Sequence, residues 1–356
     1  MVFSDRKGSV LVIVIWIIGI LSILAVSVSV ITSGEVYFIK RYRNQTTAYF
    51  IARAGILKAI AELELDKSLT PTYGALNSGW SNTPDLFRDK KVGSGFFSVS
   101  YEYASGLTTQ STEGEQTVIT NTFYGMMDEE RKININTASM PILQALFQER
   151  AGLTPSQTKE IADSIIDWRD KDNNRRENGA ENEYYQSLPQ AYSCKNSNFD
   201  VLEELILVKG IKPDIFYAVK DFITLYGDGK VNINTAPYPV LRALGLSDSL
   251  SNKIIHCRAG GDGIEGTEDD EVFTKTSDNN SILTARESLT SSEIASINNL
   301  IITNAVTIQS NYFRIISEGY LADIDIENEN AEKDKKNSKK ITCIVHRNGK
   351  IVYWQE

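Results

Sequence analysis

The stretch Val10–Ile31, VLVIVIWIIGILSILAVSVSVI, decides the architecture because it is almost wholly apolar and carries no charge. Its 22 residues make about 33 Å of helix at about 1.5 Å per residue, which is long enough to cross a bilayer. Uncharged sequence runs from Ser9 to Gly34. We therefore expect a transmembrane helix at residues 9–33.

The sequence after this span predicts that the same helix continues. Glu35–Leu65 contains no proline and spaces its apolar residues loosely for one helical face, with charges between them. The short positive pair Arg6-Lys7 is also typical of an ordinary secretory signal or signal anchor, and that alternative stays open. One continuous helix of roughly 85 Å is our prediction. The expected face comprises Val36, Ile39, Tyr49, Phe50, Ile56, Leu57, Ile60 and Leu63.

The composition excludes several classes of protein. With 37 basic and 46 acidic residues the net charge is −9, which gives no bulk attraction to nucleic acid. Three cysteines are too few for a disulfide scaffold or a thiolate zinc site, and two histidines leave little for histidine-based metal chemistry. A hydrophobic content of 42% argues against wholesale disorder.

The remaining sequence predicts an α+β fold in which a helical domain interrupts a strand-rich one. Alternating or β-rich runs predict antiparallel strands, and the stretch Asp323–Lys339 between two of them predicts a solvated loop. Helical periods and caps dominate the middle of the chain. We expect a first strand-rich part at residues 34–137, a helical insert at 138–310 and closing strands at 311–356. The predicted strands are Gly95–Tyr103, Gln116–Tyr124, Phe313–Gly319, Lys340–His346 and Lys350–Trp354.

An internal repeat lies at both ends of the first half of the insert. Lys132–Leu146 reads KININTASMPILQAL, and Lys230–Leu244, 98 residues later, reads KVNINTAPYPVLRAL. Each copy predicts a short strand, asparagine and threonine side chains that cap the next helix, and a proline in its first turn. We expect two related halves, 138–229 and 230–310, and interpret the repeat as a strand-to-helix corner rather than a ligand site.

The segment Arg6-Lys7-Gly8, followed by the apolar run from Ser9, resembles the start of type IV pilins and type II secretion pseudopilins. The resemblance implies cleavage by a prepilin peptidase between Gly8 and Ser9, methylation, and retention of the span as an assembly stalk. Most of these proteins carry a glutamate where this chain has Ile13. The K-type minor pseudopilins typically lack that acid, and a buried carboxylate without a partner amine would be costly in the bilayer.

The repeat, its lead-in Asp221–Lys230 and the ending Val352–Glu356 resemble the K-type minor pseudopilins over most of the chain. This resemblance implies a pilin-like α/β domain on the long helix, interrupted by a large all-α insert of the SAM or helix-hairpin-helix kind. It also implies a tip subunit that caps or initiates the pseudopilus with the I- and J-type and major pseudopilins. Further implied partners are the secretin and the exported substrates. The expected location is the inner membrane, single-pass, with a cytoplasmic N-terminus and a periplasmic bulk.

Asp167–Glu181 concentrates oxygen ligands in one short loop. Counted from Asp170, side-chain oxygens fall at positions 1, 3, 5, 9 and 12, as in an EF-hand, although Arg175 replaces the glycine of position six. Oxygen donors without thiol or imidazole favour calcium over zinc. The resemblance to the K-type calcium site supports Asp170, Asp172 and Glu181 as ligands. Asp167 and Asn174 are further candidates.

Two more predictions concern the insert. The acidic run Gly261–Glu271 carries Asp262, Asp269 and Asp270, whose mutual repulsion a second calcium ion would relieve, so we expect one or two ions. Exported chains permit disulfides, and Cys194 and Cys257 are a candidate pair.

The sequence contains no motif of a nucleophile with its base and no phosphate-cradling loop, so we expect no enzymatic activity. The rival hypothesis is a membrane-anchored DNA-uptake receptor, because Leu205–Pro213 resembles a helix-hairpin-helix. Its usual Gly-Ile-Gly is Gly210-Ile211-Lys212 here, and the surroundings are acidic, so no nucleic acid is expected as a partner. A minor pilin of a related type IV filament is the other alternative.

Overall fold

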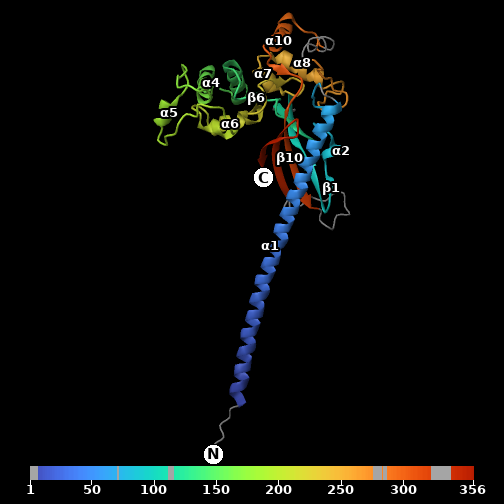
Figure 1. Ribbon diagram of the computed structural model, residues 1–356, viewed down its shortest axis with the longest axis vertical. Coiled ribbons are helices and arrows are strands. Elements are labelled where there is room, and N and C mark those ends of the chain that lie inside the picture. Colours follow the sequence, from blue (N-terminus) through green and yellow to red (C-terminus); the bar gives the residue numbers. More distant parts are fainter. Residues whose placement is uncertain (1–6, 70–71, 111–115, 276–282, 284–286, 322–337) are drawn as a thin grey trace, which may run out of the picture.

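The protein is a long helix with a globular head at one end, in a computed structural model that describes residues 7–69, 72–110, 116–275, 283, 287–321 and 338–356 (Figure 1). The head contains an antiparallel sheet packed along the helix and a helical insert at the end farthest from residue 7. The α+β fold predicted from the sequence is confirmed. The polar stretch 323–339 lies almost entirely outside the described residues.

Helix α1 runs without interruption over Lys7–Leu69, which is about 95 Å at the standard rise. Its apolar first part is exposed throughout, as expected of a surface that faces lipid, and among the described residues it is the helix that could span a membrane by length and hydropathy. The second part packs on the sheet. The predicted packing face was partly wrong, because Phe50 and Leu57 face solvent while Ala48, Ile51 and Ala52 are buried.

The sheet has the strand order β1-β2-β10-β11-β12, and the short strand β5 also pairs with β10. All of these pairs are antiparallel, as the alternating sequence predicts. A separate antiparallel pair is formed by β3 and β4, and the short helix α2 (Pro84–Phe87) precedes β1. The strands are β1 (Lys90–Val92), β2 (Gly95–Val99), β3 (Tyr101–Gln110), β4 (Gln116–Phe123), β5 (Met127–Asp128), β10 (Tyr312–Leu321), β11 (Ser338–His346) and β12 (Ile351–Gln355).

Strand β10 alternates between the two faces of the sheet. Phe313, Ile315 and Ser317 are buried against α1, whereas the residues between them are half-buried on the opposite face. Gly319 continues the buried series where the backbone of α1 comes closest to the sheet. A Cβ atom at Gly319 would meet backbone atoms of Ala48 and Ala52. The helix and the sheet are therefore in contact without an intervening side chain at this point.

The insert has its own apolar core, built from residues between Ile133 and Val306. Two short parallel strand pairs lie at its base, β6 with β7 and β8 with β9. Its described elements are β6 (Ile133–Asn134), α3 (Met140–Ala151), α4 (Pro155–Arg169), α5 (Asn182–Gln186), η1 (Leu202–Leu207), α6 (Pro213–Val219), η2 (Lys220–Phe222), β7 (Ile223–Thr224), β8 (Val231–Asn232), α7 (Tyr238–Ala243), α8 (Asp248–Arg258), α10 (Ser291–Ile302) and β9 (Val306–Thr307).

Each repeat copy uses its second asparagine to bind a distant loop. Asn136 accepts from the backbone N–H of Phe199 at 2.8 Å and donates to its carbonyl at 3.1 Å. Asn234 makes the same two bonds with Phe273, at 2.9 and 3.0 Å. These paired bonds imitate a strand ladder, so each asparagine ties a loop to its corner.

An arginine at the end of the second helix after each corner, α4 or α8, donates hydrogen bonds to two carbonyls of that corner. Arg169 donates to the carbonyls of Ile135 and Ala138, and Arg258 donates to the corresponding carbonyls of Ile233 and Ala236. The strand-to-helix corner and the proline in the first turn of each helix are as the sequence predicts. The predicted capping is wrong, because α3 and α7 have no side-chain cap, and Asn232 and Thr235 bind the carboxylate of Asp128 instead. The loop that leaves each arginine is acidic in both halves.

Candidate metal centre

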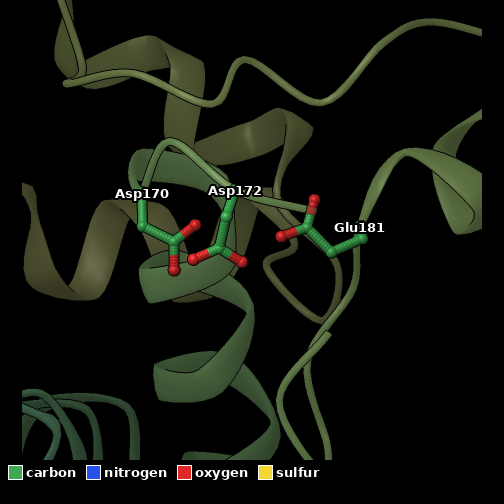
Figure 2. Close-up of side chains that lie close together, drawn as sticks. All are labelled: Asp170, Asp172 and Glu181. Atoms are coloured by element: carbon green, nitrogen blue, oxygen red, sulfur yellow. The ribbon is translucent and has the colours of Figure 1, made fainter. Parts of the chain in front are cut away.

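Three carboxylates converge in the loop between α4 and α5. Asp170 is the C-cap of α4, Asp172 lies two residues later, and Glu181 is the N-cap of α5. One carboxylate oxygen from each lies within 4.8 Å of the other two, and Figure 2 shows the three side chains pointing toward one another. These are the three residues for which the sequence analysis had the strongest expectation.

The carboxylate oxygens of this cluster lack the partners that buried acids normally have. Both oxygens of Glu181 and Oδ1 of Asp170 are buried and accept no hydrogen bond. Burial raises the pKa of Glu181, and the charges of Asp167 and Asp170 raise it further. Burial and the charge of Asp172 likewise raise the pKa of Asp170. Three mutually repelling carboxylates with unused lone pairs are the donor set of a hard divalent cation.

The other two candidate ligands are placed differently. Asp167 is fully buried and accepts the backbone N–H of Arg176 with both oxygens, at 3.3 and 3.1 Å. Burial raises its pKa to about 6. Asn174 is exposed, and its backbone N–H binds Oδ1 of Asp172 at 2.7 Å. Asp167 therefore holds the loop from within, and Asn174 orients Asp172 through its backbone.

The structure does not bring the three candidate carboxylates of the second acidic loop into one cluster of the metal-binding type. Asp269 accepts the backbone N–H groups of Gly261 and Asp262, at 2.6 and 3.1 Å, and Asp270 accepts that of Gly266 at 2.7 Å. Asp262 accepts the N–H of Ile264. These oxygens close turns of the loop, and within the described ranges the metal-type cluster is the one at Asp170, Asp172 and Glu181.

The predicted disulfide between Cys194 and Cys257 is wrong. Both are buried thiols, as is Cys343. The Sγ atom of Cys194 lies 3.8 Å from the carbonyl of Asp167 in the first half of the insert, whereas Cys257 belongs to α8 in the second half. Burial raises the pKa of Cys194 to about 11, so this thiol is held protonated as a small apolar group.

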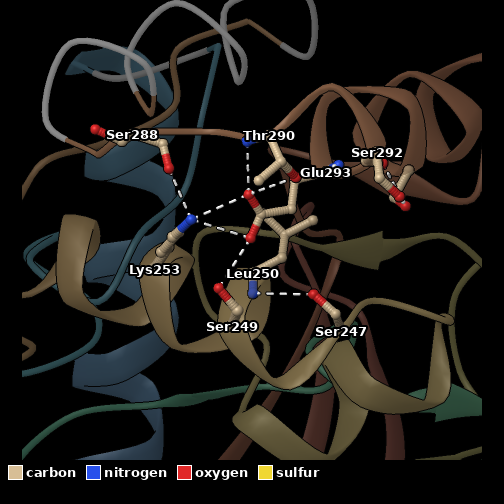
Figure 3. A network of polar contacts seen from close by, with 9 residues as sticks. Ser247, Ser249, Leu250, Lys253, Ser288, Thr290, Ser292 and Glu293 are labelled. Carbon is tan, nitrogen blue, oxygen red and sulfur yellow. Dashed lines mark hydrogen bonds and ion pairs between the residues drawn. The ribbon is translucent and has the colours of Figure 1, made fainter.

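Glu293 is an acid in the first turn of α10, in the second half of the insert. It closes a capping box with Thr290 at the start of α10 and also pairs with Lys253 of α8 at 3.0 Å (Figure 3). Ser249 of α8 donates to the same carboxylate at 2.9 Å. These contacts lower the pKa of Glu293 to about 2, and the backbone N–H of Thr290 has the largest effect. Glu293 thus joins two helices.

Replacing Glu293 by glutamine is expected to lower the free energy of unfolding by about 1 kcal/mol, the usual value of a helix cap. Because the folded pKa lies below the ordinary 4.5, the contribution is present above pH 4.5 and is lost as the pH falls toward 2. Urea unfolding of the wild type and the variant between pH 7 and pH 3 measures this. The control is Glu287→Gln, which breaks an exposed pair with His256 and should cost at most about 0.5 kcal/mol. Equal losses for both variants would contradict the prediction.

The charged run Asp128–Lys132 between β5 and β6 went unnoticed in the sequence analysis. All five of its side chains are buried. Asp128 accepts from Ser310 and Thr235, both at 2.6 Å, and so joins the first strand-rich part to the second half of the insert. Burial raises the pKa of Glu130 to about 8, and the neighbouring charge of Asp128 raises it further. The run is the junction between the sheet and the insert.

The hairpin at Leu205–Pro213, which resembles a DNA-binding motif, packs against other parts of the insert. Gly210 has a left-handed backbone, with φ of 86°, and lies against Ile161 of α4. The ammonium of Lys209 pairs with Glu160 at 3.0 Å and donates to the carbonyls of Asn178 and Gly179. This lysine clamps the end of the acidic loop, which leaves it poorly placed to bind a phosphate.

The predicted cleavage position lies in the first turn of α1, which begins at Lys7. Gly8 and Ser9 have helical backbones, and residues 1–6 lie outside the described residues. The prepilin peptidase cleavage between Gly8 and Ser9 stays a prediction.

Comparison with known proteins gives three concordant results. A family model described as type II secretion system (T2SS), protein K, matches residues 120–228. The protein named type II secretion system protein K of Pseudomonas aeruginosa is 31% identical over 126 residues, which cover 35% of this chain and 37% of that one. Its namesake in Pectobacterium carotovorum is 31% identical over 108 residues, covering 29% and 33%.

The matched region spans about a third of the length of these curated relatives. The fold similarity extends much further. A chain of the GspK-GspI-GspJ complex from enterotoxigenic Escherichia coli superposes with a TM-score of 0.62 and 14% identity, covering 89% of this chain and 98% of that one. This likeness shows that the fold over most of this chain is shared with a solved structure.

Proposed function

We propose that this chain is a K-type minor pseudopilin that forms the tip of the periplasmic pseudopilus, because residues 120–228 match the family model described as type II secretion system (T2SS), protein K. It acts by assembly and has no catalytic role. Its partners are the I- and J-type minor pseudopilins and the major pseudopilin below them. The solved complex of GspK with GspI and GspJ, a chain of which has a similar fold, supports this choice of partners.

The position of the insert is the observation that supports a place for this subunit at the tip of the filament. It lies at the end of the molecule farthest from residue 7, with α10 above the end of α1 and α4, α5 and α6 projecting to one side (Figure 1). Filaments of this kind stack subunits along their helices, so a subunit above this one would collide with the insert. The insert is then free to face the secretin and the exported substrates.

The membrane segment completes the proposal. Residues 9–33 anchor the chain in the inner membrane with the head in the periplasm, after prepilin peptidase cleaves between Gly8 and Ser9 and the new end is methylated. Ile13 supports an initiating position, because a subunit without a neighbour above it has no amine to pair with a glutamate there.

Labelling the full-length chain in assembled filaments tests the proposed position. Antibody-bound gold on a tag after Glu356 should appear at filament ends alone. Labels distributed along the shaft would contradict the tip position while leaving the family assignment intact.

We further propose that Asp170, Asp172 and Glu181 bind calcium, with Asp167 and Asn174 supporting the loop. Calcium at about 100 times its Kd should raise the free energy of unfolding by about 2.7 kcal/mol, because the ion binds the folded loop alone. Thermal melts in calcium and in chelator measure this difference, which should narrow as the pH falls and the carboxylates become protonated.

Asp170→Asn is expected to abolish most of the calcium effect, and Asp214→Asn, at an exposed acid of α6 outside both acidic loops, is the matched control. Superimposed melts of the wild type in calcium and chelator would contradict the site. Calorimetric titration decides the number of ions: a stoichiometry of one restricts binding to the first loop, whereas two ions would support the second site at Asp262, Asp269 and Asp270.

A further inference from the structure

A cleft of about 1220 Å³ separates the outer face of the sheet from the insert. One wall is formed by β3 and by the half-buried residues of β10 and β11, including Ile316. The other wall is formed by α3, α6 and α7 of the insert. A cleft of this size has room for several residues of an extended chain, because ligand pockets for much smaller molecules occupy about 300–1,000 Å³.

Arg131 lines this cleft in an unusual state for a buried arginine. Its side chain is 5% exposed, and its guanidinium stacks on the ring of Tyr103 at 4.6 Å. Within the described part of the chain it forms no ion pair and no side-chain hydrogen bond. Stacking occupies the face of the guanidinium and leaves its N–H groups, which lie in its plane, available.

Arg150 also lines the cleft, in a similar arrangement. It belongs to the last turn of α3, and its guanidinium lies over the ring of Phe222 at 4.4 Å. It too has no carboxylate partner among the described residues. The other arginine of the cleft differs, because Arg314 is paired with Glu129 at 2.5 Å. Two guanidinium groups that line the cleft are therefore available for an external acid.

The rest of the lining narrows the class of ligand. Four carboxylates also face the cleft, and they would repel a polyanion such as nucleic acid. Aromatic rings lie between them, and one of these, Tyr217, is 62% exposed. A polypeptide segment with apolar side chains and a single acid fits this lining of carboxylates and aromatic rings better than a densely charged ligand does. The lining acids are Glu102, Glu149, Asp221 and Glu318, and the rings are Tyr101, Tyr217, Phe222 and Tyr238.

We propose that this cleft binds an extended segment of another polypeptide, whose carboxylate is held by Arg131 and Arg150 while its apolar side chains rest on the aromatic rings. The inference does not depend on the tip position or on calcium. The cleft between the sheet and the insert is then the site at which the head recognises another polypeptide.

A random dodecapeptide phage library, selected on the full chain in detergent, tests the proposal. Selected peptides should share an Asp or Glu among apolar residues. In fluorescence anisotropy, changing that acid to its amide should weaken binding about tenfold, and so should Arg131→Gln or Arg150→Gln, because each change removes a charge-assisted contact. Arg88→Gln is the control, since Arg88 also lies over a ring, that of Tyr124, outside the cleft.

Arg150 is exposed, so its variant should fold even if that of the buried Arg131 does not. Failure to enrich any peptide family would overturn the proposal. Enriched peptides that lack an acid, or that bind the Arg150→Gln chain as tightly as the wild type, would overturn it equally.

Discussion

Gly319→Ala should severely destabilise the head, with a loss of about 3 kcal/mol or more in the free energy of unfolding. A methyl group at this position would meet the carbonyl oxygen of Ala48 and the nitrogen of Ala52, which are backbone atoms of α1. A helix backbone cannot rotate away as a side chain can, so α1 would have to separate from β10 along their contact. Overpacking of this kind commonly costs about 1–3 kcal/mol even where side chains can adjust.

Gly79→Ala is the matched control, because a Cβ atom there meets nothing within 4 Å. Urea unfolding of both variants, with the chain in detergent, gives the comparison. An unfolding midpoint of Gly319→Ala that coincides with that of Gly79→Ala would show that the helix and the sheet are not in backbone contact.

Glu129→Gln should have the second large effect, a loss of about 3–5 kcal/mol, because it leaves buried cations without their counter-charge. Glu129 is fully buried and accepts from Lys132 at 3.0 Å, Arg314 at 2.5 Å and Thr224 at 2.7 Å. Burial alone would raise the pKa of Glu129, but the two cations outweigh it and lower the pKa to about 2. The carboxylate is therefore ionised at neutral pH and holds β6 and β7 of the insert to β10.

The pH dependence gives an independent check on Glu129. Since its folded pKa is about 2 and its ordinary value is 4.5, the stabilisation is present above pH 4.5 and disappears as the pH falls toward 2. The difference in stability between the wild type and Glu129→Gln should shrink over this window. Glu318→Gln, on the outer face of β10, should change stability by at most about 1 kcal/mol. A difference between wild type and Glu129→Gln that stays constant with pH would contradict the assignment.

The long helix and the repeat were predictable because each depends on residues that are close together in the sequence. A charge-free run and an unbroken helical stretch specify α1 whatever it packs against, and the two copies of Ile-Asn-Thr-Ala specify the same corner twice. The three carboxylates were also predictable, because Asp170, Asp172 and Glu181 lie within one loop. Their convergence follows from the short chain that joins α4 to α5.

Features that depend on distant parts of the chain were not predictable. Five consecutive charged residues, Asp128–Lys132, would ordinarily be solvated, and nothing local indicates that their partners Thr224, Ser310 and Arg314 enclose them. The packing face of α1 was partly missed for the same reason, since small residues such as Ala48 and Ala52 pack closely while larger apolar residues face solvent. The pairing of Cys194 with Cys257 failed because spacing does not reveal which half of the insert each residue packs in.

The most direct test of the central claim is association of the head, from about Thr32 onward, with the soluble domains of the I- and J-type minor pseudopilins. Size exclusion with light scattering in calcium gives the mass of any complex, and duplex DNA serves as a parallel ligand. We predict a discrete complex with one copy of each protein and no binding of DNA. A head that remains monomeric with both proteins, yet binds DNA in a salt-sensitive manner, would contradict the proposed function and favour a membrane-anchored DNA receptor.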